Sequence, residues 1–280
     1  MVVTGTIDEL RDNVARWRDD GQCIVFVPTM GNLHDGHLEL VRQARLVGDR
    51  IIASIYVNPL QFNNGADFDS YPRTVETDRE KLLAAEVDLL FLPEEKTLYP
   101  FGRDDSVIVH VPGLSDILCG AFRPGHFDGV STIVTKLFNV VQPDKAVFGA
   151  KDYQQLLLIR RLSRDLCLPV EILSVDTVRE ADGLALSSRN AYLTVDQRRQ
   201  AAALYRELQQ IREAIGLGRR DFDVLQRQAM QSLTDHGFRP EYCEIRRADD
   251  LALPQHGDSA LIVLAAAWLG PARLIDNLAI

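Results

Sequence analysis

The sequence predicts an α/β fold in which a domain built on a parallel sheet precedes a smaller α+β domain. In the first part of the chain, apolar runs of strand length alternate with helical patterns, which is typical of strands buried on both faces of a parallel sheet. From about Arg179 onward, helical patterns come first and strand patterns follow, which favours an α+β domain. We therefore expect one domain over residues 1–177 and a second over residues 178–280.

The first domain is expected to open with a helix. Thr6 and Glu9 have the spacing of a capping box, and Gly21 follows where such a helix would end. The expected strands are the segments QCIVFVP, RIIASIYVN, VDLLFL, a short SVIVHV, KAVFG and PVEILSV. Helices are expected between them at residues 35–47, 74–85, 130–141 and 152–166. Right-handed crossovers would wind these units into one sheet.

The second domain is expected to begin with helices and to end with strands. Thr194 and Gln197 have capping-box spacing at the start of a long helix, which we expect over residues 195–215. A second helix is expected over residues 222–235, and strands in the segments EYCEIRR, ALIVLAAAW and RLID. This segregation of helices from strands is what distinguishes the second domain from the first.

The composition predicts a soluble cytoplasmic protein. The net charge of -9 argues against a broad nucleic-acid-binding surface, although a local cationic pocket is compatible with it. The four cysteines are scattered, as in a reducing cytosol, and the charged first residues do not fit a signal peptide. The longest apolar run, ALIVLAAAWLG, is too short to span a bilayer. We therefore expect no nucleic-acid partner and no membrane partner.

Polar clusters follow three of the expected strands. GNLHDGH comes after the first strand, NPLQF after the second and GAKDYQQ after KAVFG. Ligands of open parallel sheets bind beyond the carboxyl ends of the strands. The three clusters are therefore expected to converge on one site.

The cluster GNLHDGH places His34 and His37 between a strand and a helix. A Walker loop needs GK[ST] where this chain has GHL, and the dinucleotide pattern GxGxxG is also absent. A helix N-terminus still attracts anions, glycine lets a phosphate approach the backbone, and histidines donate hydrogen bonds to it. A metal pair is the weaker interpretation because no third ligand is evident. Taken alone, the two histidines fit an ordinary polar loop equally well.

A resemblance to a known family decides between these alternatives. TMGNLHDGH resembles the HxGH element of the nucleotidyltransferase superfamily, shared with class I aminoacyl-tRNA synthetases, and LALSSRN resembles their KMSKS-like loop. Further segments resemble the pantothenate synthetase (pantoate–β-alanine ligase) family over essentially the whole chain. They are VNPLQF, YPRT, RPGHFDGVSTIV, FGAKDYQQL, VREADGLALSSRNAYL, EIRRADDL and AAWLGPARLIDN.

The resemblance implies an enzyme of pantothenate and coenzyme A biosynthesis. It would join pantoate to β-alanine, cleaving ATP to AMP and pyrophosphate through a pantoyl-adenylate, with Mg²⁺ on the phosphates. It would be a homodimer with a Rossmann-like N-terminal domain and a C-terminal lid. Because the attacking carboxylate is already ionised, catalysis would consist of positioning and of stabilising phosphate charge.

The resemblance also implies roles for individual residues around ATP. The expected catalytic residues are His34, His37, which matches the family's proton-donor position, Lys151 and Arg189. Nucleotide contacts are implied for these four and for Met30, Gly31, Gly36, Gly149, Asp152, Val178, Leu186, Ser187 and Ser188. The plainer alternatives are a solvated lysine at 151, a helix cap at Asp152 and a polar interdomain linker in SSRN. Ala150 stands where the family more often has a polar residue.

The residues implied for the two other substrates follow the second and later strands. Gln61 and Gln155 match the pantoate positions, and Pro28, Met30 and Val130 would supply an apolar wall. Asn58, Gln61, Tyr71 and Arg123 are candidates to orient β-alanine, and Asp78 matches a magnesium-associated position. An ordinary loop amide or a solvated helix carboxylate is the alternative for the glutamines and for Asp78. The segment QFNNGADF would form a flap or an interface.

Two other functions use the same residues. One is an adenylyltransferase that releases its AMP-bearing product, which would need no amine for turnover. The other is a catalytically silent relative acting as a binding module, against which the intact His34, His37, Lys151 and Arg189 argue.

Overall fold

The computed structural model describes residues 1–62, 68, 69 and 71–280 and divides into two compact units. The first unit consists of residues 1–150 and 155–176, and the second of residues 151–154 and 177–280. Each unit is described by itself. Most of the segment QFNNGADF, for which a flap or an interface is expected, lies outside the described residues.

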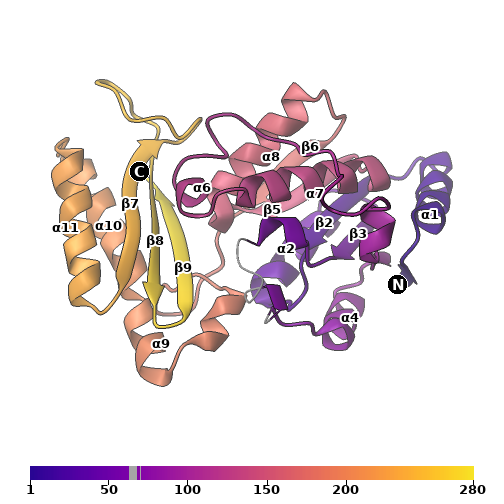
Figure 1. Ribbon diagram of the computed structural model, residues 1–280, viewed down its shortest axis with the longest axis horizontal. Coiled ribbons are helices and arrows are strands. Elements are labelled where there is room, and N and C mark those ends of the chain that lie inside the picture. Colours follow the sequence, from indigo (N-terminus) through magenta and orange to yellow (C-terminus); the bar gives the residue numbers. More distant parts are fainter. Residues whose placement is uncertain (63–67, 70) are drawn as a thin grey trace. The chain divides into compact units, whose positions relative to one another are not determined.

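The first unit is built on a six-stranded sheet in the order β1-β4-β3-β2-β5-β6 (Figure 1). All neighbouring strands pair in parallel, which confirms the predicted fold class. The strands are β1 (Val2–Thr4), β2 (Ile24–Thr29), β3 (Arg50–Ile55), β4 (Leu89–Phe91), β5 (Lys145–Gly149) and β6 (Glu171–Val175).

Helices cover both faces of this sheet. The helical elements of the chain up to β6 are α1 (Ile7–Asp19), α2 (Asp35–Arg45), α4 (Val75–Ala84), α5 (Glu95–Leu98), α6 (Cys119–Phe122), α7 (His126–Val141) and α8 (Tyr153–Asp165), with 3-10 turns η1 (Pro59–Gln61) and η2 (Ala150–Asp152). Residues 151–154, at the end of η2 and the start of α8, belong to the second unit. Side chains alternate along β2: Val25 and Val27 pack into one apolar cluster with residues of α2 and α4. Phe26 instead meets Phe138 of α7 edge to face, at 6.5 Å between ring centroids.

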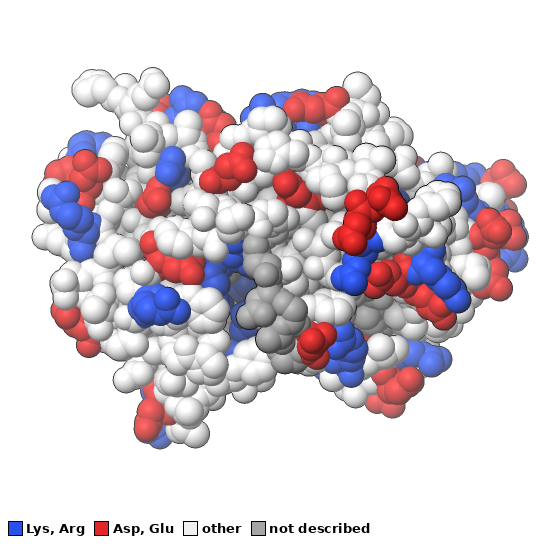
Figure 2. Space-filling view, in the orientation of Figure 1, with Lys and Arg blue, Asp and Glu red and all other residues white. Residues whose placement is uncertain are grey.

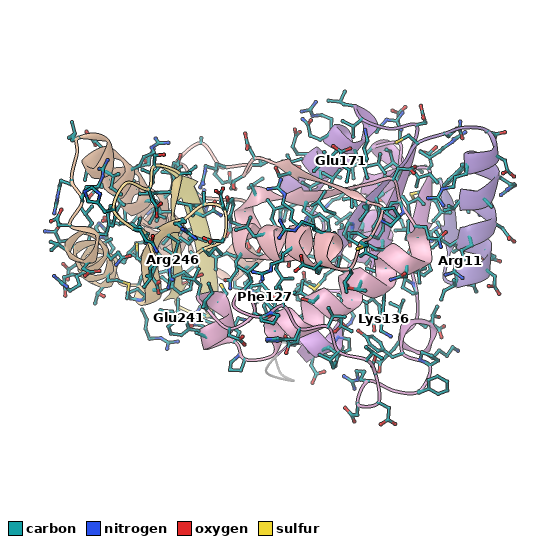
Figure 3. All side chains as sticks on the ribbon, turned by 90° about the horizontal axis from the view of Figure 1, so that it is seen from above. Arg11, Phe127, Lys136, Glu171, Glu241 and Arg246 are labelled. Atoms are coloured by element: carbon teal, nitrogen blue, oxygen red, sulfur yellow. The ribbon has the colours of Figure 1, made fainter. Side chains whose placement is uncertain are left out.

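Helices α1 and α7 lie side by side. Arg11 of α1, labelled in Figure 3, donates from Nη2 to the carbonyl oxygen of Asn139 at 3.2 Å. The apolar residues Leu10 and Val14 of α1 are buried. The predicted helix start is confirmed at Thr6, whose hydroxyl accepts from the backbone N–H of Glu9 at 3.4 Å.

Three predictions for the first unit need correction. The short strand SVIVHV does not form, because the N–H of Val109 donates to the Thr132 hydroxyl at 2.9 Å instead of joining a ladder. Strand β1 was not predicted, since three residues at a sheet edge give no measurable periodicity. Helix α7 begins at His126, four residues before the predicted start, because Gly125 adopts a left-handed conformation with φ of 79° and starts the helix there.

The second unit packs helices against a three-stranded antiparallel sheet (Figure 1). Its elements are η3 (Ser188–Tyr192), α9 (Val195–Ala201), α10 (Ala203–Gly216), α11 (Phe222–Asp235), β7 (Arg239–Arg247), β8 (Leu261–Leu269) and β9 (Ala272–Ala279). The predicted capping box at Thr194 and Gln197 is present in both directions. The prediction of one continuous helix is wrong: α9 ends at Ala201, Ala202 is its cap, and α10 begins at Ala203.

Figure 2 shows basic and acidic side chains interspersed over the face in view. Among the helices of the described part, none combines the length and the apolar character that crossing a bilayer requires.

Candidate functional site

The order of the strands marks one place at the carboxyl end of the sheet, between β2 and β5. The chain passes from β2 to β3 in one direction and from β5 to β6 in the other, while β2 and β5 pair with each other. The carboxyl ends of two such strands flank the crevice where ligands of doubly wound sheets bind. The predicted histidine cluster follows β2, and Gly149, a predicted nucleotide contact, ends β5.

The two predicted histidines form the cap of α2. His34 is the N-cap residue, and its Nδ1 accepts a hydrogen bond from the N–H of Gly36 at 3.1 Å. The backbone N–H of His34 donates to Nδ1 of His37 at 3.3 Å, which completes a reciprocal capping box. Each neutral ring therefore carries its proton on Nε2, which makes Nε2 the donor atom. The three-residue spacing of these histidines is the N-cap to N3 spacing.

The turn that carries His34 is anchored from α4. The carboxylate of Asp78 accepts the N–H groups of Asn32 and Leu33, both at 2.8 Å, and Lys81 donates to the carbonyl oxygen of Leu33 at 2.6 Å. Gly31 has φ of 80°, and a Cβ there would lie 3.1 Å from Oδ2 of Asp78. Only glycine fits this turn without displacing its anchor.

A buried amide network follows β3. The side-chain amide of Asn58 donates to the carbonyl oxygen of Gly129 at 3.0 Å and to Oε1 of Gln61 at 3.4 Å, and it accepts from the Tyr99 hydroxyl at 2.8 Å. The Gln61 amide also contacts the sulfur of Met30. A Cβ at Gly129 would lie 2.5 Å from the backbone nitrogen of Gln61, so α7 and η1 are in close contact. The predicted substrate residues Asn58, Gln61 and Met30 are thus brought together.

His126 was missed at the sequence level. Its Nδ1 lies 2.6 Å from the carbonyl oxygen of Gln61, and its Nε2 lies 3.1 Å from Nη1 of Arg123. Because a guanidinium only donates, Nε2 accepts and Nδ1 donates. Arg123 also donates from Nη2 to the Gln61 carbonyl at 3.4 Å. The quoted segment RPGHFDG contains this histidine and was the available signal.

The other predicted substrate residues lie on neighbouring elements. Pro28 is half-buried near the end of β2, and Val130 is buried in α7. The ring of Tyr71 packs edge to face on Phe62, at 5.6 Å between centroids. Gln155 is half-buried in the first turn of α8. Their contacts with substrate remain predictions.

In the second unit, a tight hairpin carries Val178 and Leu186, two of the predicted nucleotide-binding residues. The N–H of Leu186 donates to the carbonyl oxygen of Val178 at 2.9 Å, and Arg179 pairs with Ala185 as an isolated antiparallel bridge. Gly183 at the tip has φ of 94° and packs on Tyr205, whose Cδ1 would be 2.5 Å from an added Cβ. This hairpin delivers the chain to Ser187.

The segment Ser187–Arg189 forms the beginning of η3. The Ser187 hydroxyl accepts from the N–H of Arg189 at 3.3 Å, and Asn190 donates from its side chain to the carbonyl oxygen of Ala185 at 3.0 Å. Two hydroxyls, at 187 and 188, and one guanidinium therefore sit on a single short turn. Hydroxyls and guanidinium groups are suited to phosphate oxygens.

Lys151 belongs to the second unit together with Asp152. Its Nζ lies 3.8 Å from Oδ2 of Asp152, and its side chain is 19% exposed. The Lys151 carbonyl oxygen accepts from the side-chain amide of Asn277 at 2.8 Å. The role of Lys151 toward phosphate stays a prediction.

A buried ion pair next to Lys151 was not predicted as functional. Arg179 donates to both carboxylate oxygens of Asp276, at 2.6 and 2.8 Å, and its guanidinium carbon lies 3.8 Å above the Tyr205 ring. Burial raises the pKa of the Asp276 carboxyl, and the hydrogen bonds from Arg179 oppose that shift. The pair joins residues that are 97 positions apart, so no local pattern could indicate it.

The described residues do not fit a protein-held metal at Asp78. Its carboxylate is 1% exposed and accepts from two backbone N–H groups and, at 3.0 Å, from the Thr74 hydroxyl. These bonds occupy three of about four acceptor positions of a carboxylate. Within residues 1–62, 68, 69 and 71–280, no group of three or more His, Cys, Asp or Glu side chains could hold a metal ion. The magnesium role of Asp78 stays a prediction.

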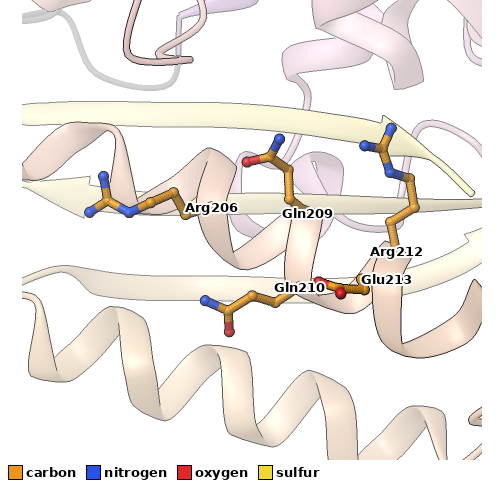
Figure 4. Close-up of a pocket in the computed structure, with 5 residues that line it drawn as sticks. All are labelled: Arg206, Gln209, Gln210, Arg212 and Glu213. Carbon is orange, nitrogen blue, oxygen red and sulfur yellow. The ribbon is translucent and has the colours of Figure 1, made fainter. Parts of the chain in front are cut away.

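A separate hollow lies on α10 (Figure 4). Its volume is about 540 Å³, and it is lined by Arg206, Gln209, Gln210, Arg212 and Glu213. All five belong to one helix and none is a predicted site residue. We do not assign the site there.

Comparisons with known proteins agree along the whole chain. The family model described as Pantoate-beta-alanine ligase matches residues 2–279. The pantothenate synthetase of Shewanella amazonensis is 55% identical over 278 residues, which cover 99% of both chains. That of Laribacter hongkongensis is 54% identical over 280 residues, covering 100% of this chain and 99% of its own.

Solved structures give the same result. The crystal structure of pantothenate synthetase from Thermus thermophilus matches with a TM-score of 0.91 and 45% identity, covering 99% of each chain. The pantoate-beta-alanine ligase from Francisella tularensis, complexed with beta-gamma ATP and beta-alanine, matches with a TM-score of 0.83 and 32% identity. That match covers 100% of this chain and 97% of the other.

Proposed function

The chain belongs to the pantoate–β-alanine ligase family, and on that premise we propose how its own residues carry out the ATP-dependent condensation of pantoate with β-alanine. The observation that carries the proposal is the reciprocal cap formed by His34 and His37 at the start of α2. The cap fixes both rings at a helix N-terminus. This terminus follows β2, next to β5, where the chain connections leave the two strands in opposite directions. Such a terminus attracts anions, among them the phosphate groups of ATP.

The first step forms a pantoyl-adenylate. The pantoate carboxylate, ionised at neutral pH, attacks the α-phosphorus of ATP, a P–O bond forms, and pyrophosphate leaves with the electron pair of the broken P–O bond. His34 and His37 donate from Nε2 to phosphate oxygens in this account. His37 acts as a hydrogen-bond donor to charge that grows as pyrophosphate leaves. No general base is needed, because the attacking carboxylate is already ionised.

The second unit supplies the remaining positive charge. Lys151 is a point charge for the leaving phosphates, and Ser187, Ser188 and Arg189 bind phosphate oxygens. Main-chain groups of Val178, Leu186 and Gly149, with Met30, Gly31, Gly36 and Asp152 around them, hold the rest of the nucleotide. In this proposal residues 1–177 bind ATP and pantoate, and residues 178–280 act as a lid.

Pantoate and β-alanine bind along the buried amide network. Gln61 and Gln155 bind the pantoate hydroxyl and carboxylate groups, while Pro28, Met30 and Val130 contact its methyl groups. The amine of β-alanine then attacks the adenylate carbonyl, an amide bond forms, and AMP leaves. Asn58, Tyr71 and Arg123 orient this second substrate. The network from Tyr99 through Asn58 to Gln61 supports fixed geometry for both amides.

Magnesium is expected to arrive with the phosphates of ATP rather than to occupy a protein site. Mg²⁺ keeps several waters and bridges phosphate oxygens, so it needs few protein ligands. The carboxylate of Asp78, which already accepts three hydrogen bonds within the protein, supports this distribution of ligands.

We expect a cytoplasmic homodimer. Exposed apolar side chains after β4 support an interface between copies, since Val107 is 79% and Ile108 is 49% exposed. Four free cysteines among the described residues fit a reducing compartment. Sedimentation at micromolar concentration should give a mass of two chains, and a monomer there would contradict the dimer.

Alanine variants test the phosphate site. His37→Ala and Lys151→Ala should each lower kcat about 100-fold or more, because each removes a donor to developing phosphate charge. His256→Ala and Lys96→Ala are matched controls on exposed residues and should keep near-normal rates. Near-normal kcat in both His37→Ala and Lys151→Ala, with the fold intact by circular dichroism, would refute the assignment. Multiple turnovers that release pyrophosphate and the AMP-bearing product without any amine would instead indicate an adenylyltransferase.

A further inference from the structure

Three residues of the second unit link its two predicted phosphate-binding segments. Asp276 and Asn277 are adjacent on β9, and both are buried, at 4% and 8% exposure. Asp276 receives the bidentate pair from Arg179, while Asn277 donates to the Lys151 carbonyl at 2.8 Å. One strand therefore contacts both the lysine segment and the hairpin that leads to Ser187.

Arg179 fixes the hairpin from inside. Besides its bonds to Asp276, it donates to the carbonyl oxygens of Gly183 at 3.0 Å and Asn277 at 3.3 Å. The Tyr205 ring covers its other side. Its two terminal nitrogens thus donate to four acceptors, and these hydrogen bonds fix the hairpin to β9.

From these contacts we infer that Arg179, Asp276 and Asn277 are positioning residues that hold Lys151 and the segment Ser187–Arg189 at a fixed separation for the adenylation step. The inference deepens the proposed function and rests on it, because it takes Lys151 and Arg189 as phosphate ligands. None of the three is proposed to touch ATP. They act through the Lys151 carbonyl and through the hairpin backbone.

A second ion pair on β9 serves as a comparison, because its bonds fit a purely stabilising role. Arg273 of β9 pairs with Glu241 of β7, labelled in Figure 3, at 2.7 Å, and the two side chains are 9% and 14% exposed. Trp268 of β8 also donates to Glu241 at 2.6 Å. These bonds of Glu241 join the three strands to one another, whereas those of Asp276 and its neighbour Asn277 reach the hairpin and Lys151. Breaking either pair should destabilise the unit, but only the second should disturb adenylation.

The test measures the two half-reactions separately. Asn277→Leu removes the amide donor at similar volume, Asp276→Asn weakens the hold on Arg179, and Glu241→Gln is the control. Pantoate-dependent pyrophosphate–ATP exchange reports adenylation, and β-alanine attack on synthetic pantoyl-adenylate reports the second step. Exchange should fall about 100-fold in Asn277→Leu and Asp276→Asn, the loss expected for a displacement of about 1 Å. Attack on the adenylate should change less than about threefold.

Other outcomes discriminate between explanations. Equal losses in both half-reactions, or the same loss in Glu241→Gln, would show a merely structural role and overturn the inference. If Asp276→Asn fails to fold, Asn277→Leu alone decides, because it leaves the ion pair intact. Lys151→Ala is run in parallel: normal exchange there would refute the phosphate-binding role that the proposed function gives Lys151. Impaired Lys151→Ala beside a normal Asn277→Leu would refute only the positioning role.

Discussion

Asp78 offers a prediction whose size follows from counted hydrogen bonds. Replacing it with alanine leaves the part-buried N–H of Asn32 and the buried N–H of Leu33 without the carboxylate that accepts them at 2.8 Å each. A buried donor left unsatisfied costs about 1–3 kcal/mol. Two such donors give about 4 kcal/mol for Asp78→Ala. Asp78→Asn should cost about half as much, since one amide oxygen can still accept one N–H while the amide nitrogen opposes the other.

Urea unfolding followed by circular dichroism measures this loss of unfolding free energy. The KM for ATP measures its effect on the turn that carries His34. Because the same turn carries His34, Asp78→Ala should also raise the KM for ATP. Glu76→Ala is the matched control in the same first turn of α4: its side chain is 84% exposed, so the expected change is below about 1 kcal/mol. An Asp78→Ala variant as stable as Glu76→Ala would refute the anchoring role. A stable variant with an altered magnesium requirement would point to a metal ligand instead.

Two further predictions concern titratable groups. The hydrogen bond to Asp128 raises the pKa of His110, and the charge of Asp116 adds to the effect. The protonated imidazole therefore stabilises the folded state fully below about pH 6.5, and this stabilisation is lost as pH rises through the raised pKa. Thermal unfolding from pH 5 to 9 should show this loss in the wild type and not in His110→Asn, and identical profiles would contradict it. Burial raises the pKa of Cys243 to about 12, whereas Cys167 is exposed. A thiol reagent at pH 8 should therefore label Cys167 and reach Cys243 only on unfolding, and labelling of native Cys243 would disprove its burial.

Much of the fold was predictable because its signals are local. The strands buried on both faces of the first sheet appear as apolar runs, and the cap at Thr194 appears as a four-residue pattern. The failures arise where distant contacts decide. Val109 finds Thr132 rather than a strand partner. The helix break at Ala202 has no glycine or proline to announce it, and that residue keeps a helical φ of -63°.

The candidate site divides in the same way. The convergence of the histidine cluster and Gly149 followed from strand ends in a parallel sheet. The mutual capping of His34 and His37 did not, because a histidine cap has no established sequence signature. Contacts of His126 with Gln61, and of Arg179 with Asp276, span 65 and 97 positions, so only the folded chain reveals them.

The central claim is that this chain activates pantoate as an adenylate before any amine takes part. Exchange of labelled pyrophosphate into ATP, measured with and without pantoate and in the absence of β-alanine, tests that claim most directly. We predict exchange that depends on pantoate and that gives way to release of AMP and pantothenate when β-alanine is added. No exchange in the presence of pantoate, from protein that still binds ATP, would contradict the account.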